Sequence, residues 1–124
     1  MDIFIIQTAA ATTAQLAPFM PFLIDVGKAG AKKLAEVIAE KGGYAAWEKA
    51  KVLWDKLKAK WGDDSEIQSA ATMVAAKPKD ENRQMMLAEI LGTRLQENPQ
   101  FANELFKLLG GQEVVQEVIA ERGW

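Results

Sequence analysis

The sequence predicts an all-α bundle of five or six helices with a short extended hydrophobic arm at its N-terminus. Apolar residues recur at intervals of three and four along most of the 124-residue chain, which is the spacing of one face of a helix. Glycines, prolines and paired acidic residues interrupt this pattern where helices would begin and end. We therefore expect the arm at residues 1–12 and a single helical domain at residues 13–124.

The first two dozen residues differ from the rest, because no charged side chain occurs in residues 3–24. The run IFII at residues 3–6 favours β-structure and predicts an extended arm. Residues 3–24 are long enough to cross a bilayer as a helix, which takes about 20 residues. Threonines, glutamines and the prolines Pro18 and Pro21 make the segment a poor span. Asp2 stands where a signal peptide would carry positive charge, so no signal peptide is expected.

A helix is predicted to start near Thr13 and to end at residue 40 or 41, where a Gly-Gly pair stops it. Gly27 and Gly30 give this helix a small-residue face that another helix could approach closely. The two prolines leave open whether the stretch is one helix or two.

The clearest predicted helix covers residues 44–61, where Trp47, Trp54 and Trp61 recur every seven residues. This spacing favours a seam of the core, although a terminal tryptophan could instead anchor a subunit interface. Lysines on the same helix raise the question of nucleic-acid binding. The isoelectric point near 5.2 and the small number of arginines argue against it, so we expect no nucleic-acid partner.

Turn-forming residues bound four further predicted helices. Ser65 is the predicted N-cap of the first, and Trp124 is expected to fold back over the end of the last. The four extend from Ser65 to the break at residues 77–80, from there to about Gln96, from Asn98-Pro99 to Gly110-Gly111, and from Gln112 to about Arg122.

One heptapeptide occurs twice, at residues 36–42 and 117–123, with identity at six of seven positions. Helix ends that share a glycine stop tend to look alike, which favours coincidence. The other interpretation is a degenerate duplication in which both helix ends meet equivalent surfaces.

The residue types needed for common catalytic sites are missing. The chain has no Cys and no His, which excludes disulfides, thiolate nucleophiles, Cys/His zinc sites and haem ligation by either residue. The acidic pair Asp63-Asp64 is better explained as the start of a helix, where negative charge is favourable. The glycine- and lysine-rich residues 27–33 lack the spacing of a phosphate loop. We expect no enzyme activity, no catalytic, cofactor-binding or metal-binding residues, no cofactor and no small-molecule substrate.

Two segments carry a resemblance. The helix AWEKAKVLWDKL at residues 46–57 and the run PQFANEL at residues 99–105, with an alanine-rich helix before a proline between them, resemble a loose group of uncharacterised bacterial helical proteins. That group shares an AW-KAK-LW--L helix and a P-FA-EL--LL helix, and the resemblance covers residues 44–109. It implies a bacterial origin and an interaction role, and it transfers no catalytic residues.

The hydrophobic arm would aggregate if it were left in water, so it must be covered by its own core, by a neighbouring subunit or by lipid. The function expected first is a non-enzymatic structural module that self-assembles into homo-oligomers or a filament. The alternative is a membrane-inserting or membrane-anchored protein, in which lysines after the charge-free segment meet anionic head groups. The third is a protein–protein adaptor. The expected interface residues are Ile3, Phe4, Ile5, Ile6, Phe19, Phe22, Gly27, Gly30 and Trp124.

Charge is divided unevenly between the two halves of the chain. Residues 1–61 carry a net charge of +3 and residues 62–124 a net charge of −5. This division is compatible with head-to-tail contact between copies or with a basic face toward an anionic surface. The expected location is the bacterial cytoplasm or an assembly outside the cell.

Overall fold

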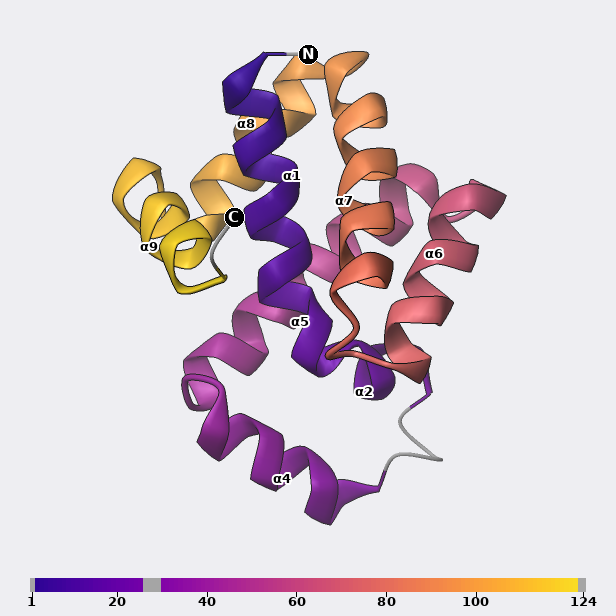
Figure 1. Cartoon of the computed structure of the whole chain (residues 1–124), viewed down its shortest axis with the longest axis vertical. Coiled ribbons are helices and arrows are strands. Elements are labelled where there is room, and N and C mark those ends of the chain that lie inside the picture. Colours follow the sequence, from indigo (N-terminus) through magenta and orange to yellow (C-terminus); the bar gives the residue numbers. More distant parts are fainter. Residues whose placement is uncertain (1, 26–29, 123–124) are drawn as a thin grey trace.

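A computed structural model describes residues 2–25 and 30–122 and shows an all-helical protein (Figure 1). Within the described residues there is no strand, the helical content is 85%, and seven helices are present when the run Ile3–Ile24 is counted as one. The elements are α1 (Ile3–Leu16), the 3-10 turn η1 (Ala17–Phe19), α2 (Met20–Ile24), α4 (Ala31–Glu40), α5 (Tyr44–Trp61), α6 (Ser65–Ala76), α7 (Glu81–Gln96), α8 (Pro99–Leu109) and α9 (Gln112–Arg122).

The N-terminal segment is helical, so the predicted extended arm is wrong. The Asp2 carboxylate caps α1 by accepting a hydrogen bond from the backbone N–H of Ile5 at 3.2 Å. Ile5 is only 3% exposed, because α1 packs inside the bundle. A local preference for β-structure is weak beside such burial, and a lone extended segment would leave its backbone groups unpaired. The predicted boundary between residues 12 and 13 falls inside α1, and five or six helices is fewer than the seven observed.

The two prolines bend the N-terminal helix without ending it. Pro18 lies in the first turn of η1 and Pro21 in the first turn of α2, where a missing backbone N–H costs little. The helical run ends at Asp25, whose backbone N–H donates to the carbonyl of Pro21 at 3.1 Å. The next element that the structure describes is α4, which begins at Ala31, so the described parts of residues 13–40 belong to two separate helical runs.

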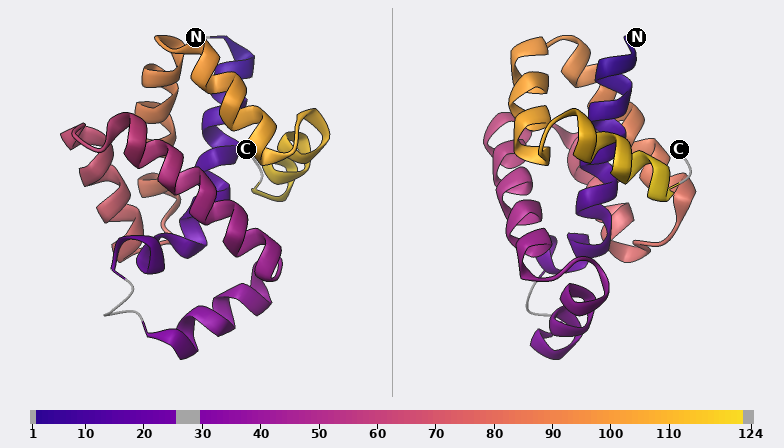
Figure 2. Two further views of the ribbon diagram at one scale, coloured as in Figure 1. Left: turned by 180° about the vertical axis from the view of Figure 1, so that it is seen from behind. Right: turned by 90° about the vertical axis from the view of Figure 1, so that its left-hand side faces the viewer.

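The helix α1 runs through the middle of the molecule. In Figure 1 it lies between α9 on one side and α7 on the other, and the view from behind in Figure 2 shows α5 crossing over it. It contacts α5, α7, α8 and α9. Its buried residues are Ile5, Thr8, Ala9, Ala10, Ala11, Thr12, Thr13, Ala14 and Leu16. The charge-free segment is therefore the centre of the core.

The tryptophan stripe of α5 packs into the same core, as the seven-residue spacing predicts. Trp47 and Trp54 are 8% and 4% exposed. The Trp61 ring is half-buried and meets the ring of Phe101 edge-on, with 5.0 Å between their centroids. Trp47 joins α5 to η1 through its contact with Phe19, and Trp61 joins α5 to α8 through Phe101.

Most helix ends lie where the sequence places them, with two differences in capping. Asp64, not Ser65, is the N-cap of α6, and its carboxylate accepts hydrogen bonds from the backbone N–H groups of Glu66 and Ile67. Asn98 occupies the N-cap of α8, but its side chain donates to the carbonyl of Arg94 at 3.1 Å. Gly110 ends α8 with φ of 118°, a left-handed conformation that only glycine adopts easily.

Candidate functional site

No group of three or more His, Cys, Asp or Glu side chains within residues 2–25 and 30–122 could hold a metal ion. Of the acidic pair that precedes α6, Asp64 is used in structure, because it caps α6 and pairs with Arg94. The feature that sets this protein apart is its central apolar helix.

The run Ile3–Ile24 is the one helix in the described part of the chain that is long and apolar enough to cross a membrane, by length and composition. Its 22 residues contain no charged side chain. A straight α-helix of 22 residues would be about 33 Å long at a rise of 1.5 Å per residue, and the hydrocarbon core of a bilayer is about 30 Å thick. In the bundle the run is bent at η1, and the unbroken α-helix α1, with 14 residues, is about 21 Å long. About 67% of its most apolar stretch is buried inside the bundle.

Two aromatic contacts hold the ends of this segment. The ring of Phe4 lies 5.1 Å from that of Phe106 on α8, and the ring of Phe19 lies 5.5 Å from that of Trp47 on α5. Contacts of this kind depend on shape and apolar area and carry no charge. The segment is therefore held by the same apolar attraction that lipid would offer.

The helix α1 carries three buried threonines, and two of them satisfy their hydroxyls within the helix. Thr12 Oγ1 donates to the carbonyl of Thr8 at 2.7 Å, and Thr13 Oγ1 donates to the carbonyl of Ala9 at 2.9 Å. These bonds would persist wherever the helix goes, because both partners belong to it. Thr8 Oγ1 differs, since it is fully buried and has no hydrogen-bond partner in the described structure.

The least firmly packed helices are α4 and α9. No residue of α4 is fully buried, and its apolar side chains Leu34, Val37 and Ile38 only partly pack against the core. In α9 the fully buried side chain among those described is Val115, at 1% exposure. An exposed hydrogen bond of 3.0 Å from Gln116 to Gln7 joins α9 to α1.

The two related heptapeptides approach the same stretch of the central helix. A hollow of about 480 Å³ separates the C-terminal ends of α4 and α9 from the junction of α1 and η1. Glu40, Lys41 and Gly42 line it from the first heptapeptide, and Val118 and Glu121 from the second. Both helix ends thus face one segment of the chain, and the duplication itself stays a prediction.

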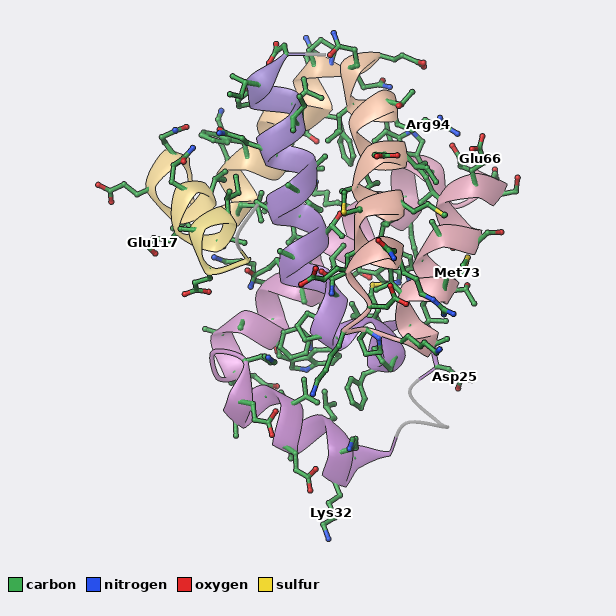
Figure 3. The ribbon with its side chains drawn as sticks, in the orientation of Figure 1. Asp25, Lys32, Glu66, Met73, Arg94 and Glu117 are labelled. Atoms are coloured by element: carbon green, nitrogen blue, oxygen red, sulfur yellow. The ribbon has the colours of Figure 1, made fainter. Side chains whose placement is uncertain are left out.

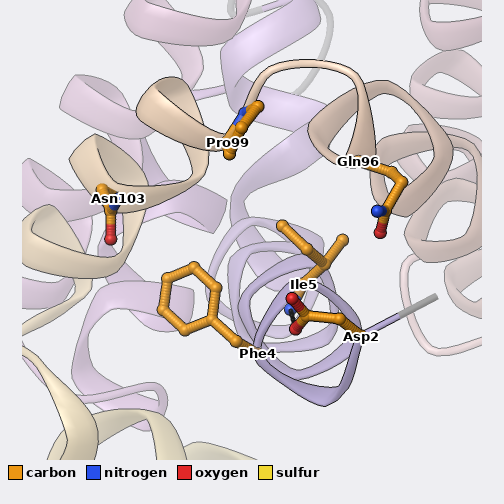
Figure 4. Close-up of a pocket in the computed structure, with 6 residues that line it drawn as sticks. All are labelled: Asp2, Phe4, Ile5, Gln96, Pro99 and Asn103. Atoms are coloured by element: carbon orange, nitrogen blue, oxygen red, sulfur yellow. Dashed lines mark hydrogen bonds between the residues drawn. The ribbon is translucent and has the colours of Figure 1, made fainter.

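A second hollow, of about 470 Å³, opens at the N-terminal end of α1 (Figure 4). Asp2, Gln96 and Asn103 supply its polar side chains, and Phe4, Ile5 and Pro99 supply its apolar wall. The Asp2 carboxylate is already used as the cap of α1. Among the described residues that line this hollow, Asp2 is the one with an ionisable side chain.

The expected interface residues are distributed between core and surface. Ile5, Phe19 and Phe22 are at most 3% exposed and belong to the core. Ile3 and Ile6 are 71% and 49% exposed on α1. The remaining four fall into two groups: Phe4 is half-buried and Gly30 is exposed ahead of α4, whereas Gly27 and Trp124 lie outside the described residues. The sequence shows the threonines and glutamines of α1 as interruptions of an apolar segment, but it does not show that Thr8, Thr12 and Thr13 are buried in the bundle.

Ionised side chains gather away from the apolar helix. Arg94 Nε contacts Asp64 Oδ2 at 2.6 Å, and Arg94 also reaches Glu66 at 3.2 Å, which joins α7 to α6 (Figure 3). The Arg94 guanidinium holds the pKa of Asp64 below its usual value, and the backbone N–H groups of Ile67 and Glu66 lower this pKa further. The same contacts raise the pKa of Arg94.

Lysines are exposed on the side of the molecule that carries α4 and α5. Lys32 and Lys33 lie at the start of α4, and Lys32 points away from the bundle in Figure 3. Lys56, Lys58 and Lys60 are exposed on the last turns of α5. The two groups of lysines lie apart, because α4 leads into the first turn of α5, and Asp55 pairs with Lys58 at 3.8 Å on the last turns.

Comparison of the chain with protein-family models, with curated proteins and with solved structures finds no match in any of the three. The resemblance of residues 44–109 to a group of bacterial helical proteins therefore stays a prediction. Any function of this chain has to be inferred from its own geometry and chemistry.

Proposed function

We propose that this protein is a conditional membrane-inserting protein, in which the bundle stores the apolar helix Ile3–Ile24 and releases it into lipid. The observation that carries this proposal is the position of a spanning-length, charge-free helix at the centre of a small bundle. A core helix of a soluble bundle normally has one apolar stripe and a polar outer face. This helix has no charged face at all.

The chemistry of the segment supports transfer to lipid. A helix satisfies its backbone hydrogen bonds internally, which is the condition for entering the hydrocarbon core. The hydroxyls of Thr12 and Thr13 are also satisfied by carbonyls of the same helix. The free energy of transfer is therefore set mainly by apolar side chains such as Phe19 and Phe22, which are buried in either environment.

The helix α4 supports an anchoring role at the membrane surface. It follows the apolar run, its apolar side chains Leu34, Val37 and Ile38 share one side, and Lys32 and Lys33 are exposed at its start. Amphipathic helices with lysines beside the apolar face lie in the head-group region of anionic membranes. We assign α4 to that region, directly after the inserted segment.

Self-association in solution, which the sequence favours first, receives less support. It depended on an extended arm that could reach a neighbour, and this segment is instead a central helix. Ile3 and Ile6 are the apolar side chains of α1 that stay exposed for such a contact. We therefore rank self-association in solution second, behind membrane insertion, among the proposed functions.

A covalent bridge between α1 and α9 tests the proposal. Gln7→Cys and Gln116→Cys replace a hydrogen-bonded pair on these two helices, and the chain has no other cysteine. A short bis-maleimide would tie α1 to α9 and keep the apolar helix in the bundle. We expect the unbridged variant to float with vesicles of phosphatidylcholine and phosphatidylglycerol, and the bridged variant to stay in solution.

The matched control is the same double variant treated with a monofunctional maleimide, which adds similar bulk without a bridge. It should float as the unbridged protein does. If bridged and unbridged proteins float equally well, α1 does not leave the bundle to bind lipid. If neither floats, the apolar helix is only the core of a soluble protein.

A further inference from the structure

A polar stripe runs along one face of the apolar helix. Thr8, Ala11, Thr12 and Gln15 have the spacing i, i+3, i+4 and i+7, which places them on one side of α1. The first three are fully buried, and Gln15 is half-buried and lines the hollow beside η1. No other face of α1 carries three polar side chains at this spacing.

Two side chains in this stripe have unmet hydrogen-bonding capacity once α1 enters lipid. Thr8 Oγ1 has no partner even in the bundle, where it is 0% exposed. The Gln15 amide has two N–H donors and a carbonyl acceptor, and a helical backbone offers it little. Gln15 lies near the middle of Ile3–Ile24, so insertion would place it deep in the hydrocarbon, where lipid offers no partner.

We propose that inserted copies of this helix associate with one another along Thr8, Ala11, Thr12 and Gln15. This inference rests on the proposed function. The Gln15 amides of neighbouring copies bond to each other, and Thr8 Oγ1 donates across the same contact. Ala11 and the short threonines let the backbones approach closely, as small residues do at helix contacts in membranes. The second copy is the partner because it brings the same donors and acceptors to the same depth.

The opposite side of the helix faces lipid. Ile3, Ile6 and Ala10 lie on that side with Thr13, whose hydroxyl is bonded to the carbonyl of Ala9. Nothing on this side needs an outside partner. One side of the helix therefore needs hydrogen-bond partners and the other does not. Each copy accordingly turns its polar stripe toward the neighbouring copy and the opposite side toward lipid.

Paired substitutions on different faces test the inference. Thr8→Val with Gln15→Leu removes the polar groups of the stripe, and Thr13→Val with Gln7→Leu makes the same chemical change off the stripe. A donor or acceptor dye at Ser69→Cys, an exposed site on α6, reports energy transfer between copies on phosphatidylcholine–phosphatidylglycerol vesicles. At equal amounts of bound protein, we expect the stripe variant to associate about tenfold more weakly and the control variant to match the parent.

Each outcome decides a separate question. If the parent protein does not bind vesicles, the proposed function and the assembly both fall. If all three proteins bind and the stripe variant keeps its energy transfer, only the assembly along this stripe is wrong. Equal loss in both variants would also overturn it, because association would then not depend on the face. Circular dichroism of each variant before vesicles are added shows that the bundle is folded.

Discussion

Asp64 combines two structural roles in one side chain. Its carboxylate caps α6 and also pairs with Arg94 on α7, and the side chain is 18% exposed. Arg94 and the capped N–H groups keep its pKa below the ordinary value of 3.8. A carboxyl whose pKa is lower in the folded than in the unfolded state stabilises the fold above the unfolded pKa. That stabilisation is lost as the pH falls through the folded pKa.

The variant Asp64→Asn should therefore be less stable than the parent at about pH 7, and the difference should shrink as the pH falls below the ordinary pKa of 3.8. Asparagine is also a good N-cap, so the change removes the charge and largely keeps the cap. Thermal unfolding followed by circular dichroism across this pH range measures the effect. Asp55→Asn, at an exposed acid on α5, is the control. A difference from the parent that does not change with pH would contradict this role of Asp64.

At the residue scale the sequence predicts helix ends better than it predicts side-chain roles. Asn98-Pro99 and Gly110 bound α8 as expected, because these residue types have strong local preferences. Asp64 and Ser65 are adjacent, and both residue types are favoured as N-caps, so local preference does not decide at which of the two the helix begins. The unpartnered hydroxyl of Thr8 depends on which helices pack around it, and no local pattern contains that information.

At the element scale, α4 and α9 should open before the rest of the bundle. Elements with little buried apolar area unfold locally at lower free energy than the core does. We expect backbone amides of α4 and α9 to exchange with deuterium faster than those of α1 and α7, as measured by mass spectrometry in the absence of lipid. The amides of α6 provide a comparison, since Ile67 and Val74 on that helix are fully buried. If the amides of all the helices exchange equally slowly, α4 and α9 do not open first, and the release of α1 cannot begin with their opening.

The elements after Gly43 follow from the sequence, whereas the N-terminal element does not. Helices α5 to α8 each begin or end at glycine, proline or aspartate, and their apolar spacing is regular. The run Ile3–Ile24 lacks such spacing because it is buried on most of its sides. Local preference then points to an extended arm, and only packing against α5, α7, α8 and α9 makes it a helix.

At the scale of the whole molecule, one segment has to suit two environments. Inside the bundle the central helix provides much of the apolar core, so its departure removes a shared packing partner of α5, α7, α8 and α9. A protein of this size could not remain closed around the missing helix. Insertion and opening of the bundle are thus coupled in the proposed function, and both should be visible in one experiment.

Limited digestion with chymotrypsin, which cuts after phenylalanine, tests the central claim most directly. Phe19 and Phe22 lie in the apolar run, and Phe101 and Phe106 lie in α8. On phosphatidylcholine–phosphatidylglycerol vesicles we expect the sites after Phe19 and Phe22 to stay protected, while the sites after Phe101 and Phe106 are cut faster than in the lipid-free protein. Equal protection of all four sites with and without vesicles, or early cutting after Phe19 and Phe22, would contradict storage and release of a membrane-inserting helix.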